Sequence, residues 1–187
     1  MKKLIALFLV LLLIPSASWA EETQEDKVES VVQMTCIVKL PKVIREGLYT
    51  GETVNGIPHG YGIFTATNSE GINWHYLGEW VNGCVTGQGG MYWDNGQTQV
   101  GTFENGDLIC GESHYEDGSK MWLDMRPDEQ GRTHKLFFRS DDTVYMEGYY
   151  DAKTGELVDC TLYTKSEEVF FKGIPGDGFD WNLIYIE

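Results

Sequence analysis

Residues 76–122 read YLGEWVNGCVTGQGGMYWDNGQTQVGTFENGDLICGESHYEDGSKMW, and this stretch decides the fold. Its segment GEWVNG at residues 78–83 returns 23 residues later as GTFENG at residues 101–106. The segment DNG at residues 94–96 likewise returns as EDG at residues 116–118. A fixed period of this size is typical of stacked repeats, in which each unit packs only on its neighbours.

Weaker copies extend the repeat in both directions. Its anchoring position falls at residues 51, 78, 101, 124, 148 and 173, which lie 27, 23, 23, 24 and 25 residues apart, and it is glycine except at Asp124. Residues 48–122 hold three clear modules, whereas residues 123–187 hold degenerate modules and a C-terminal cap. Each module is expected to contain two short strands joined through Asn-Gly, because these residues tolerate the positive φ of tight hairpin turns.

Glycine alternates with aromatic residues inside the expected strands. Tyr76, Gly78 and Trp80 share one face of a strand, and a bare glycine leaves room for a ring to lie over the backbone. A single hairpin is marginal in water, so the modules must stack to bury their rings. The sequence therefore predicts an all-β fold, an elongated single sheet of tandem β-hairpins roughly 55 Å long.

Both ends of such a sheet expose unpaired backbone groups and need capping strands. Residues 31–47 are the candidate N-terminal cap, because apolar residues alternate with mostly polar ones from Val32 to Leu40. Residues 180–186, which follow a Pro-Gly-Asp-Gly turn, are the candidate C-terminal cap, and either end could instead join copies of the chain.

The modules resemble the MORN repeat (membrane occupation and recognition nexus). The MORN pattern runs Tyr-x-Gly-Glu-Trp, Asn-Gly, His-Gly-x-Gly-x-Tyr and then an acidic or Asn-Gly turn. Module one matches with YTGE at residues 49–52 and HGYGIF at residues 59–64, and module two with YLGEW at residues 76–80. The third module lacks the aromatic residue before its first glycine. The resemblance implies a MORN-repeat solenoid; members of this family serve as scaffolds, binding surfaces and appendages to enzymes.

Residues 1–20 have the pattern of a secretory signal peptide, with a basic start, an apolar run from Leu4 to Ile14 and a small-x-small cleavage site ending at Ala20. Residues 21–30 are acidic and are expected to form a flexible leader. No later segment is long and apolar enough to span a bilayer, so an exported protein, periplasmic or secreted and without an integral membrane span, is expected.

The net charge limits the partners. It is −15 for the whole chain and, with 12 basic and 29 acidic residues after position 20, −17 for the mature chain. Such a charge argues against nucleic acid and anionic lipid. It suits either solubility alone or a basic partner.

The cysteines and histidines suggest no catalytic or metal site. Exported proteins favour disulfides, and Cys84 and Cys110 follow or lie near matching turns, so they are the candidate pair. Other connectivities and free thiols stay open. No C-x-x-C or metal-ligand spacing occurs among the cysteines and histidines, so no metal and no cofactor are expected.

The aromatic residues are the candidate binding side chains. Most are expected to pack between modules, but some could line a groove for a peptide or a sugar. The leading hypothesis is a non-enzymatic exported scaffold that binds another protein or itself, and the alternative is a module for neutral glycan or a membrane surface. An enzyme using residues 123–140 is a third hypothesis. The candidate binding residues are Tyr49, Tyr76, Trp80, Trp93, Phe103 and Trp122.

Overall fold

The computed structural model describes residues 28–40, 43–176 and 179–180. The predicted signal peptide lies outside these residues. The described residues form strands and no helix, so none of them belongs to a helix that could cross a membrane. The strands are β1 (Val28–Leu40), β2 (Val43–Val54), β3 (Ile57–Thr67), β4 (Asn73–Val81), β5 (Cys84–Trp93), β6 (Thr98–Glu104), β7 (Asp107–His114), β8 (Lys120–Asp124), β9 (Arg132–Phe138), β10 (Val144–Asp151), β11 (Leu157–Tyr163) and β12 (Val169–Gly173).

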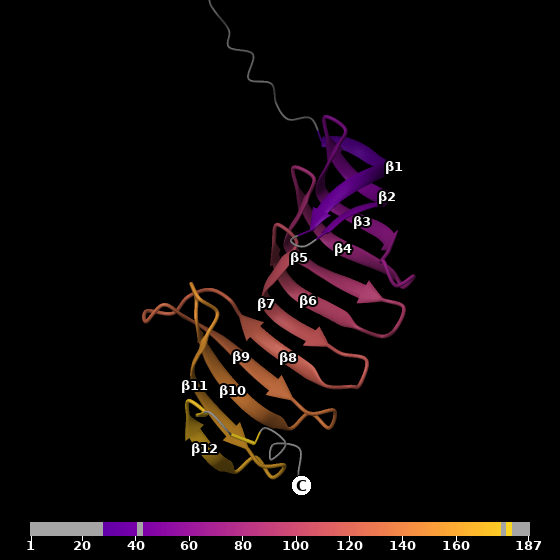
Figure 1. Ribbon diagram of the computed structural model, residues 1–187. Helices are drawn as coiled ribbons and strands as arrows, with labels where there is room; N and C mark the ends of the chain where they lie inside the picture. The colour runs from indigo at the N-terminus through magenta and orange to yellow at the C-terminus, as the bar shows by residue number, and fades with distance from the viewer. Residues whose placement is uncertain (1–27, 41–42, 177–178, 181–187) are drawn as a thin grey trace, which may run out of the picture.

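These strands form one open antiparallel sheet in which each pairs with the next along the chain. Figure 1 shows the strands following one another from β1 at one end to β12 at the other, with a continuous twist. The predicted all-β, single-sheet architecture of tandem hairpins is therefore confirmed.

The turns repeat along both long edges of the sheet. On one edge, the Asn-Gly pairs at residues 55–56, 82–83 and 105–106 all have positive φ, from 50° to 91°. On the other edge, the amides of residues 68, 93, 115, 139 and 164 each donate to the carbonyl four residues later. The second series continues past residue 122, because the turns at residues 139–143 and 164–168 keep the same backbone hydrogen bond.

One face of the sheet, here called the inner face, holds the aromatic and glycine rows. A row of glycines crosses β2 to β7 through Gly51, Gly62, Gly78, Gly89, Gly101 and Gly111. Two residues away, a neighbouring row contains Tyr49, Phe64 and Tyr76, all fully buried. The predicted glycine anchors thus line up in one continuous sheet. The fourth anchor, predicted at Asp124, was wrong, because Leu123 pairs with Gly111 and holds that place in the row.

Tyrosine rings lie flat over the glycines, as predicted. A Cβ atom placed on Gly89 would lie 2.6 Å from Cζ of Tyr76, and one on Gly62 would lie 2.6 Å from Cζ of Tyr49. Each hydroxyl is satisfied, because Tyr49 donates to the Glu52 carbonyl at 2.6 Å and Tyr76 to the Glu79 carbonyl at 3.1 Å. The missing side chains of glycine are therefore the space that the rings occupy.

The inner face carries two separate apolar cores. The first contains residues of β1 to β6 and centres on Trp80, whose ring lies 5.2 Å from Tyr49 and 5.5 Å from Tyr76 in edge-to-face contacts. The second contains Met146, Cys160 and Leu162 of β10 and β11. Between them, in the row of Tyr49 and Tyr76, β6 and β7 carry Gln99 and Ser113 in place of large apolar side chains.

The chain ends differ in part from the prediction. The β1 strand starts at Val28, so the last three residues of the expected leader belong to it. The expected cap at residues 31–47 covers most of β1 and the start of β2, since β2 begins at Val43 and runs straight into the first module. Residues 181–186 of the expected C-terminal cap lie outside the described residues.

Candidate functional site

Four of the six predicted binding aromatics are buried on the inner face, so the prediction was wrong for them. Tyr49, Tyr76, Trp80 and Phe103 are at most 1% exposed. The cause is the ring-over-glycine packing, which encloses these rings between the modules. A ligand could reach them only by breaking the first core.

Trp93 and Trp122 remain partly accessible. Trp93 lies on the inner face, where it packs beside the first core and stacks on Trp74 with ring centroids 6.4 Å apart. Trp122 belongs to the opposite, outer face, because side chains alternate along β8 and its neighbour Met121 lies in the inner row. Of the six candidates, only Trp122 therefore lies on the face that the cores leave free.

The outer face presents a central row of side chains that crosses the sheet. Register places Ile63 beside Leu77, then Gly90 beside Val100 on the following strands. The same row continues through Glu112, Trp122, Leu136, Glu147, Thr161 and Lys172. It changes from apolar to aromatic and polar along its length, which divides the outer face into two regions.

The first region, here called the apolar strip, consists of Tyr61, Ile63, Leu77, Tyr92 and Val100 on β3 to β6. Ile63, Leu77 and Val100 are 41%, 49% and 45% exposed. The Tyr92 ring covers Gly90 and stacks on His75 with centroids 5.1 Å apart. An open depression of about 470 Å³ lies over the strip between Tyr61 and Val100.

Glu79 borders the apolar strip and is held by two neutral donors. Its carboxylate accepts the Tyr61 hydroxyl at 2.8 Å and the Gln88 backbone amide at 3.0 Å. The hydrogen bond and charge of Glu79 raise the pKa of Tyr61. Tyr61 therefore stays a neutral hydroxyl, and Glu79 keeps an uncompensated negative charge beside an apolar surface.

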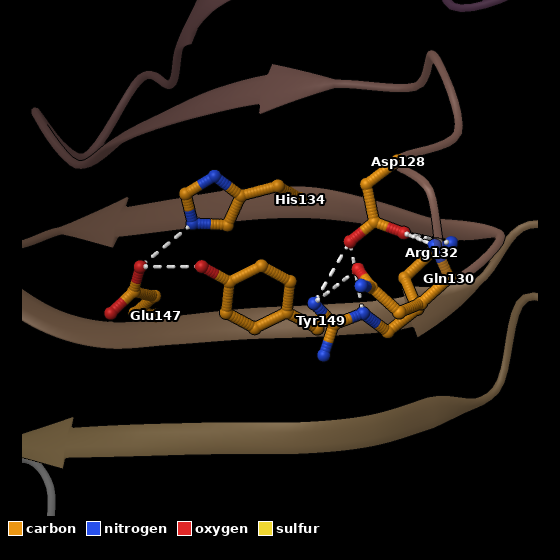
Figure 2. Close-up of polar contacts among 6 residues, drawn as sticks. All are labelled: Asp128, Gln130, Arg132, His134, Glu147 and Tyr149. Atoms are coloured by element: carbon orange, nitrogen blue, oxygen red, sulfur yellow. Dashed lines mark hydrogen bonds and ion pairs between the residues drawn. The ribbon is translucent and has the colours of Figure 1, made fainter.

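The second region, here called the polar–aromatic patch, consists of Trp122, Arg132, His134, Glu147 and Tyr149 on β8 to β10. Figure 2 shows that His134 and Tyr149 come from neighbouring strands. Their rings stack almost in parallel, with centroids 4.6 Å apart and an interplanar angle of 6°. Trp122 meets the other side of this stack edge-on, 5.3 Å from His134.

The Glu147 carboxylate is the polar centre of the patch. It accepts from Tyr149 at 3.3 Å and pairs with Nε2 of His134 at 2.9 Å (Figure 2). It also accepts from the Tyr163 hydroxyl at 3.2 Å. Desolvation and then the negative charge of Glu147 raise the pKa of both tyrosines. The arrangement holds one half-buried carboxylate among three ring side chains, which suits recognition of hydroxyl or amide groups.

Arg132, the first residue of β9, lies at the edge of the patch. Its guanidinium lies 4.6 Å from the Tyr149 ring centroid and pairs with the Asp128 carboxylate at 2.8 Å. Hydrogen bonds from Arg132, first from its backbone amide, lower the pKa of Asp128. The Arg132 guanidinium therefore lies over the Tyr149 ring while it pairs with Asp128.

The irregular region proposed for an enzyme, residues 123–140, forms parts of the β8–β9 hairpin and the turn after it. Its basic side chains do not converge. Arg126 pairs with Asp124 at 2.6 Å, whereas Arg139 donates to the carbonyls of Val144 and Tyr163. Only Arg132 and His134 from this region belong to the patch.

The predicted Cys84–Cys110 disulfide is not formed, and all four cysteines are free thiols. Cys84 lies on β5 and Cys110 on β7, with β6 between them. Strands two apart are ~9.6 Å from each other, more than the ~7 Å that a disulfide can bridge between Cα atoms. The matching turn positions are therefore too far apart for a bond.

Two of the histidines outside the patch have local partners, whereas Nδ1 of the third, His59, is buried and has no hydrogen-bond partner within the described residues. His114 pairs with Glu112 at 3.1 Å, and His75 stacks on Tyr92. Within the described ranges, no group of three or more His, Cys, Asp or Glu side chains is placed to hold a metal ion.

Comparison of the chain with models of known protein families finds no match, and comparison with curated proteins finds none either. Function is therefore inferred from the outer face itself.

Proposed function

We propose that this chain is a non-enzymatic, exported repeat protein of the MORN type that binds another protein through the outer face of its sheet. The observation that carries the proposal is a difference in exposure between the two faces of the sheet. The inner face buries its rings in two cores, whereas the outer face leaves the apolar strip on β3 to β6 exposed and the polar–aromatic patch on β8 to β10 partly accessible. Contiguous exposed apolar surface of this kind marks interaction sites.

The rigid backbone supports this role. A row of side chains that crosses hydrogen-bonded strands is spaced at ~4.8 Å and does not depend on a mobile loop. Pairing along the whole sheet fixes the position of Leu77 relative to Val100 and of Trp122 relative to Glu147. A partner would therefore meet a preformed surface, which reduces the entropy cost of binding.

The test is affinity capture with the immobilised mature chain from a cell-envelope extract at several salt concentrations. We expect a protein partner that is retained by the unaltered chain and lost when the outer face is altered by Leu77→Asn with Trp122→Ala. A matched double variant at exposed positions away from the central row, Val169→Asn with Glu156→Gln, should retain it. Failure to retain any protein at every salt concentration contradicts the proposal, unless light scattering shows that the chain binds copies of itself.

Neutral glycan is a second candidate ligand, favoured by the polar–aromatic patch. Sugar hydroxyls pair well with carboxylates, and aromatic rings stack on their apolar faces, so Trp122, Tyr149 and Glu147 form a suitable combination. Co-sedimentation with insoluble cell-wall glycan and with neutral liposomes tests it. Binding to glycan that is lost in Trp122→Ala supports this candidate, whereas binding to neither material removes it.

Export is the part of the proposal that rests on residues 1–20. A signal peptide of this pattern is cleaved after Ala20, so the mature protein should begin at Glu21. N-terminal sequencing of protein recovered from the periplasm or the medium checks this. Recovery of protein that still begins at Met1 would contradict it.

A further inference from the structure

The charges of the chain are distributed unevenly along the sheet. No Lys or Arg occurs between Arg45 and Lys120, a stretch of 74 residues that includes all of β3 to β7. The acidic residues in the same stretch are Glu46, Glu52, Glu70, Glu79, Asp94, Glu104, Asp107, Glu112, Glu116 and Asp117. The remaining 12 Lys and Arg, apart from the two in the expected signal peptide, lie toward the two ends of the chain.

The apolar strip lies inside this acidic region. Glu112 continues the central row directly beside Val100, and Glu104 lies farther along β6, on the outer face by alternation. In the part of the chain that the structure describes, Glu79, Glu104 and Glu112 form no ion pair with Lys or Arg, and the one ion pair among them joins Glu112 to His114. Glu79 and Glu104 therefore place uncompensated carboxylates near the exposed apolar side chains of the strip, whereas Glu112 already pairs with His114 and its charge acts on Lys120 of β8.

The polar–aromatic patch lacks this combination. Its charges are already matched, because Glu147 pairs with His134 and Arg132 pairs with Asp128. Lys120, Arg126 and Lys135 also lie on the strands or loop around it. A cationic partner is thus attracted to the β3–β7 part of the sheet rather than to the β8–β11 part.

We propose that the apolar strip binds an extended, cationic segment of a partner protein in which apolar residues alternate with Lys or Arg. The proposal rests on the proposed function and specifies its partner. Apolar side chains of the segment would face Ile63, Leu77 and Val100. Its long basic side chains start on the opposite face of the segment and would bend past its edges toward Glu79 and Glu104. From β3 to β6 the strip spans three strand spacings, ~14 Å, which an extended segment covers with about five residues.

Both kinds of contact contribute for physical reasons. Burial of the exposed apolar area of Ile63, Leu77 and Val100 contributes to affinity. Carboxylates without a Lys or Arg partner speed the encounter and discriminate against acidic segments. Salt should weaken the electrostatic part and leave the apolar part in place.

The probe for this proposal is a labelled peptide of alternating lysine and valine, seven residues long with lysine at both ends and with blocked termini. Fluorescence anisotropy with the full mature chain measures its affinity. Two control peptides replace every lysine by glutamate or every valine by serine. We expect the lysine–valine peptide to bind roughly ten-fold or more tightly than either control, a difference of about 1.4 kcal/mol, and to weaken as salt is added.

Matched variants then locate the site. Leu77→Asn and Val100→Asn should weaken the peptide at every salt concentration, whereas Glu104→Gln should weaken it mainly at low salt. Val169→Asn on β12, where the replaced side chain is 59% exposed, and Glu156→Gln should leave binding unchanged. Circular dichroism spectra that match the unaltered chain confirm that each variant is folded.

Two results overturn the proposal: equal binding of the glutamate–valine peptide, or binding that persists unchanged in Leu77→Asn and Val100→Asn. Failure of this inference can be distinguished from failure of the proposed function. A partner captured from the envelope extract and lost in Trp122→Ala, with no binding of the lysine–valine peptide, overturns the basic partner but leaves the outer face as a binding surface.

Discussion

At the scale of single residues, the fold depends on aromatic rings that occupy the space of missing side chains. Tyr49 on β2 lies over Gly62 on β3. In the next hairpin, Tyr76 on β4 lies over Gly89 on β5 in the same way. Because both rings are fully buried and their hydroxyls are satisfied by backbone carbonyls, they cannot move aside cheaply. The glycines are therefore required by packing as well as by backbone conformation.

The first prediction concerns Gly89→Ala. The new methyl group would overlap the Tyr76 ring, so we expect the free energy of unfolding to fall by about 1–3 kcal/mol. Urea denaturation followed by tryptophan fluorescence measures the change. Gly176→Ala, where a Cβ meets nothing within 4 Å, is the control. In a Tyr76→Leu background, Gly89→Ala should lower the free energy of unfolding by less than it does in the unaltered chain. Equal losses in the two backgrounds would contradict direct contact between the new methyl group and the Tyr76 ring.

The second prediction concerns alkaline pH. Burial raises the pKa of Tyr49 from 10.0 to about 12 and also raises the pKa of Tyr76. Below pH 10 both phenols are neutral in the folded and unfolded states. Above pH 10 the tyrosines of the unfolded chain ionise first, so the free energy of unfolding falls as the pH rises toward the pKa of the folded state. For Tyr49 alone the loss should reach roughly 3 kcal/mol above pH 12. Urea midpoints from pH 8 to 12 should decline less steeply in Tyr49→Phe, and identical slopes would refute the assignment.

At the scale of structural elements, the turns determine the geometry of each hairpin, and the row of inner-face glycines determines how the rings pack across the sheet. The three Asn-Gly turns impose the same positive-φ geometry on β2–β3, β4–β5 and β6–β7. Beyond Asp124 the loop of residues 125–131 replaces the Asn-Gly turn, and Leu123 and Lys135 replace the glycines of the inner row. The degenerate modules therefore keep the strand pairing while losing the ring-over-glycine contact at this point.

The third prediction tests the turn geometry at Asn82, whose φ is 50°. An alanine there must adopt a left-handed conformation, so Asn82→Ala should destabilise the protein by about 1–2 kcal/mol. Glycine adopts the same conformation without strain, so Asn82→Gly should cost much less. Thermal unfolding of the two variants side by side checks the order, and equal losses would show that the side chain of Asn82 matters more than its φ.

The fourth prediction concerns Ser113 on β7, in the part of the inner face that lies between the two cores. Ser113 is 2% exposed, and its hydroxyl has no hydrogen-bond partner within the described chain. Because a buried unpaired hydroxyl is unfavourable, Ser113→Ala should stabilise the protein by about 1 kcal/mol. Ser119→Ala is the matched control and should destabilise it slightly, since Ser119 donates to Asp117 at 2.6 Å. A loss of stability in Ser113→Ala would indicate a partner that the packing does not reveal.

At the scale of the whole molecule, local signals predicted the sheet but not the site. Asn-Gly turns and Gly-aromatic alternation are adjacent in sequence, so they specify hairpins without tertiary information. The patch depends on the pairing of His134 with Tyr149 and on an irregularity between Val144 and Met146, neither of which has a local signature. Sequence reasoning therefore singled out Trp122 but missed Glu147 and Tyr149 as its neighbours.

The aromatic residues that were wrongly predicted to bind a ligand are buried because of the ring-over-glycine packing. Tyr76 and Trp80 share the face of Gly78, so the ring-over-glycine packing that the sequence predicts also places them inside. The exposed face belongs to the residues between them, such as Leu77, which look like ordinary strand residues in the sequence. Strand alternation was thus informative, and the error lay in treating aromatic character as a sign of exposure.

The central claim is that the outer face binds a partner while the inner face does not, and β6 offers the most direct test. A photo-crosslinking residue is placed at Val100, on the outer face, or at its neighbour Gln99, on the inner face. The two positions are adjacent in sequence, so they share expression, location and strand. After irradiation with envelope extract, the account predicts crosslinked partner from position 100 and none from position 99. Equal crosslinking from both positions, or crosslinking from position 99 alone, would contradict it.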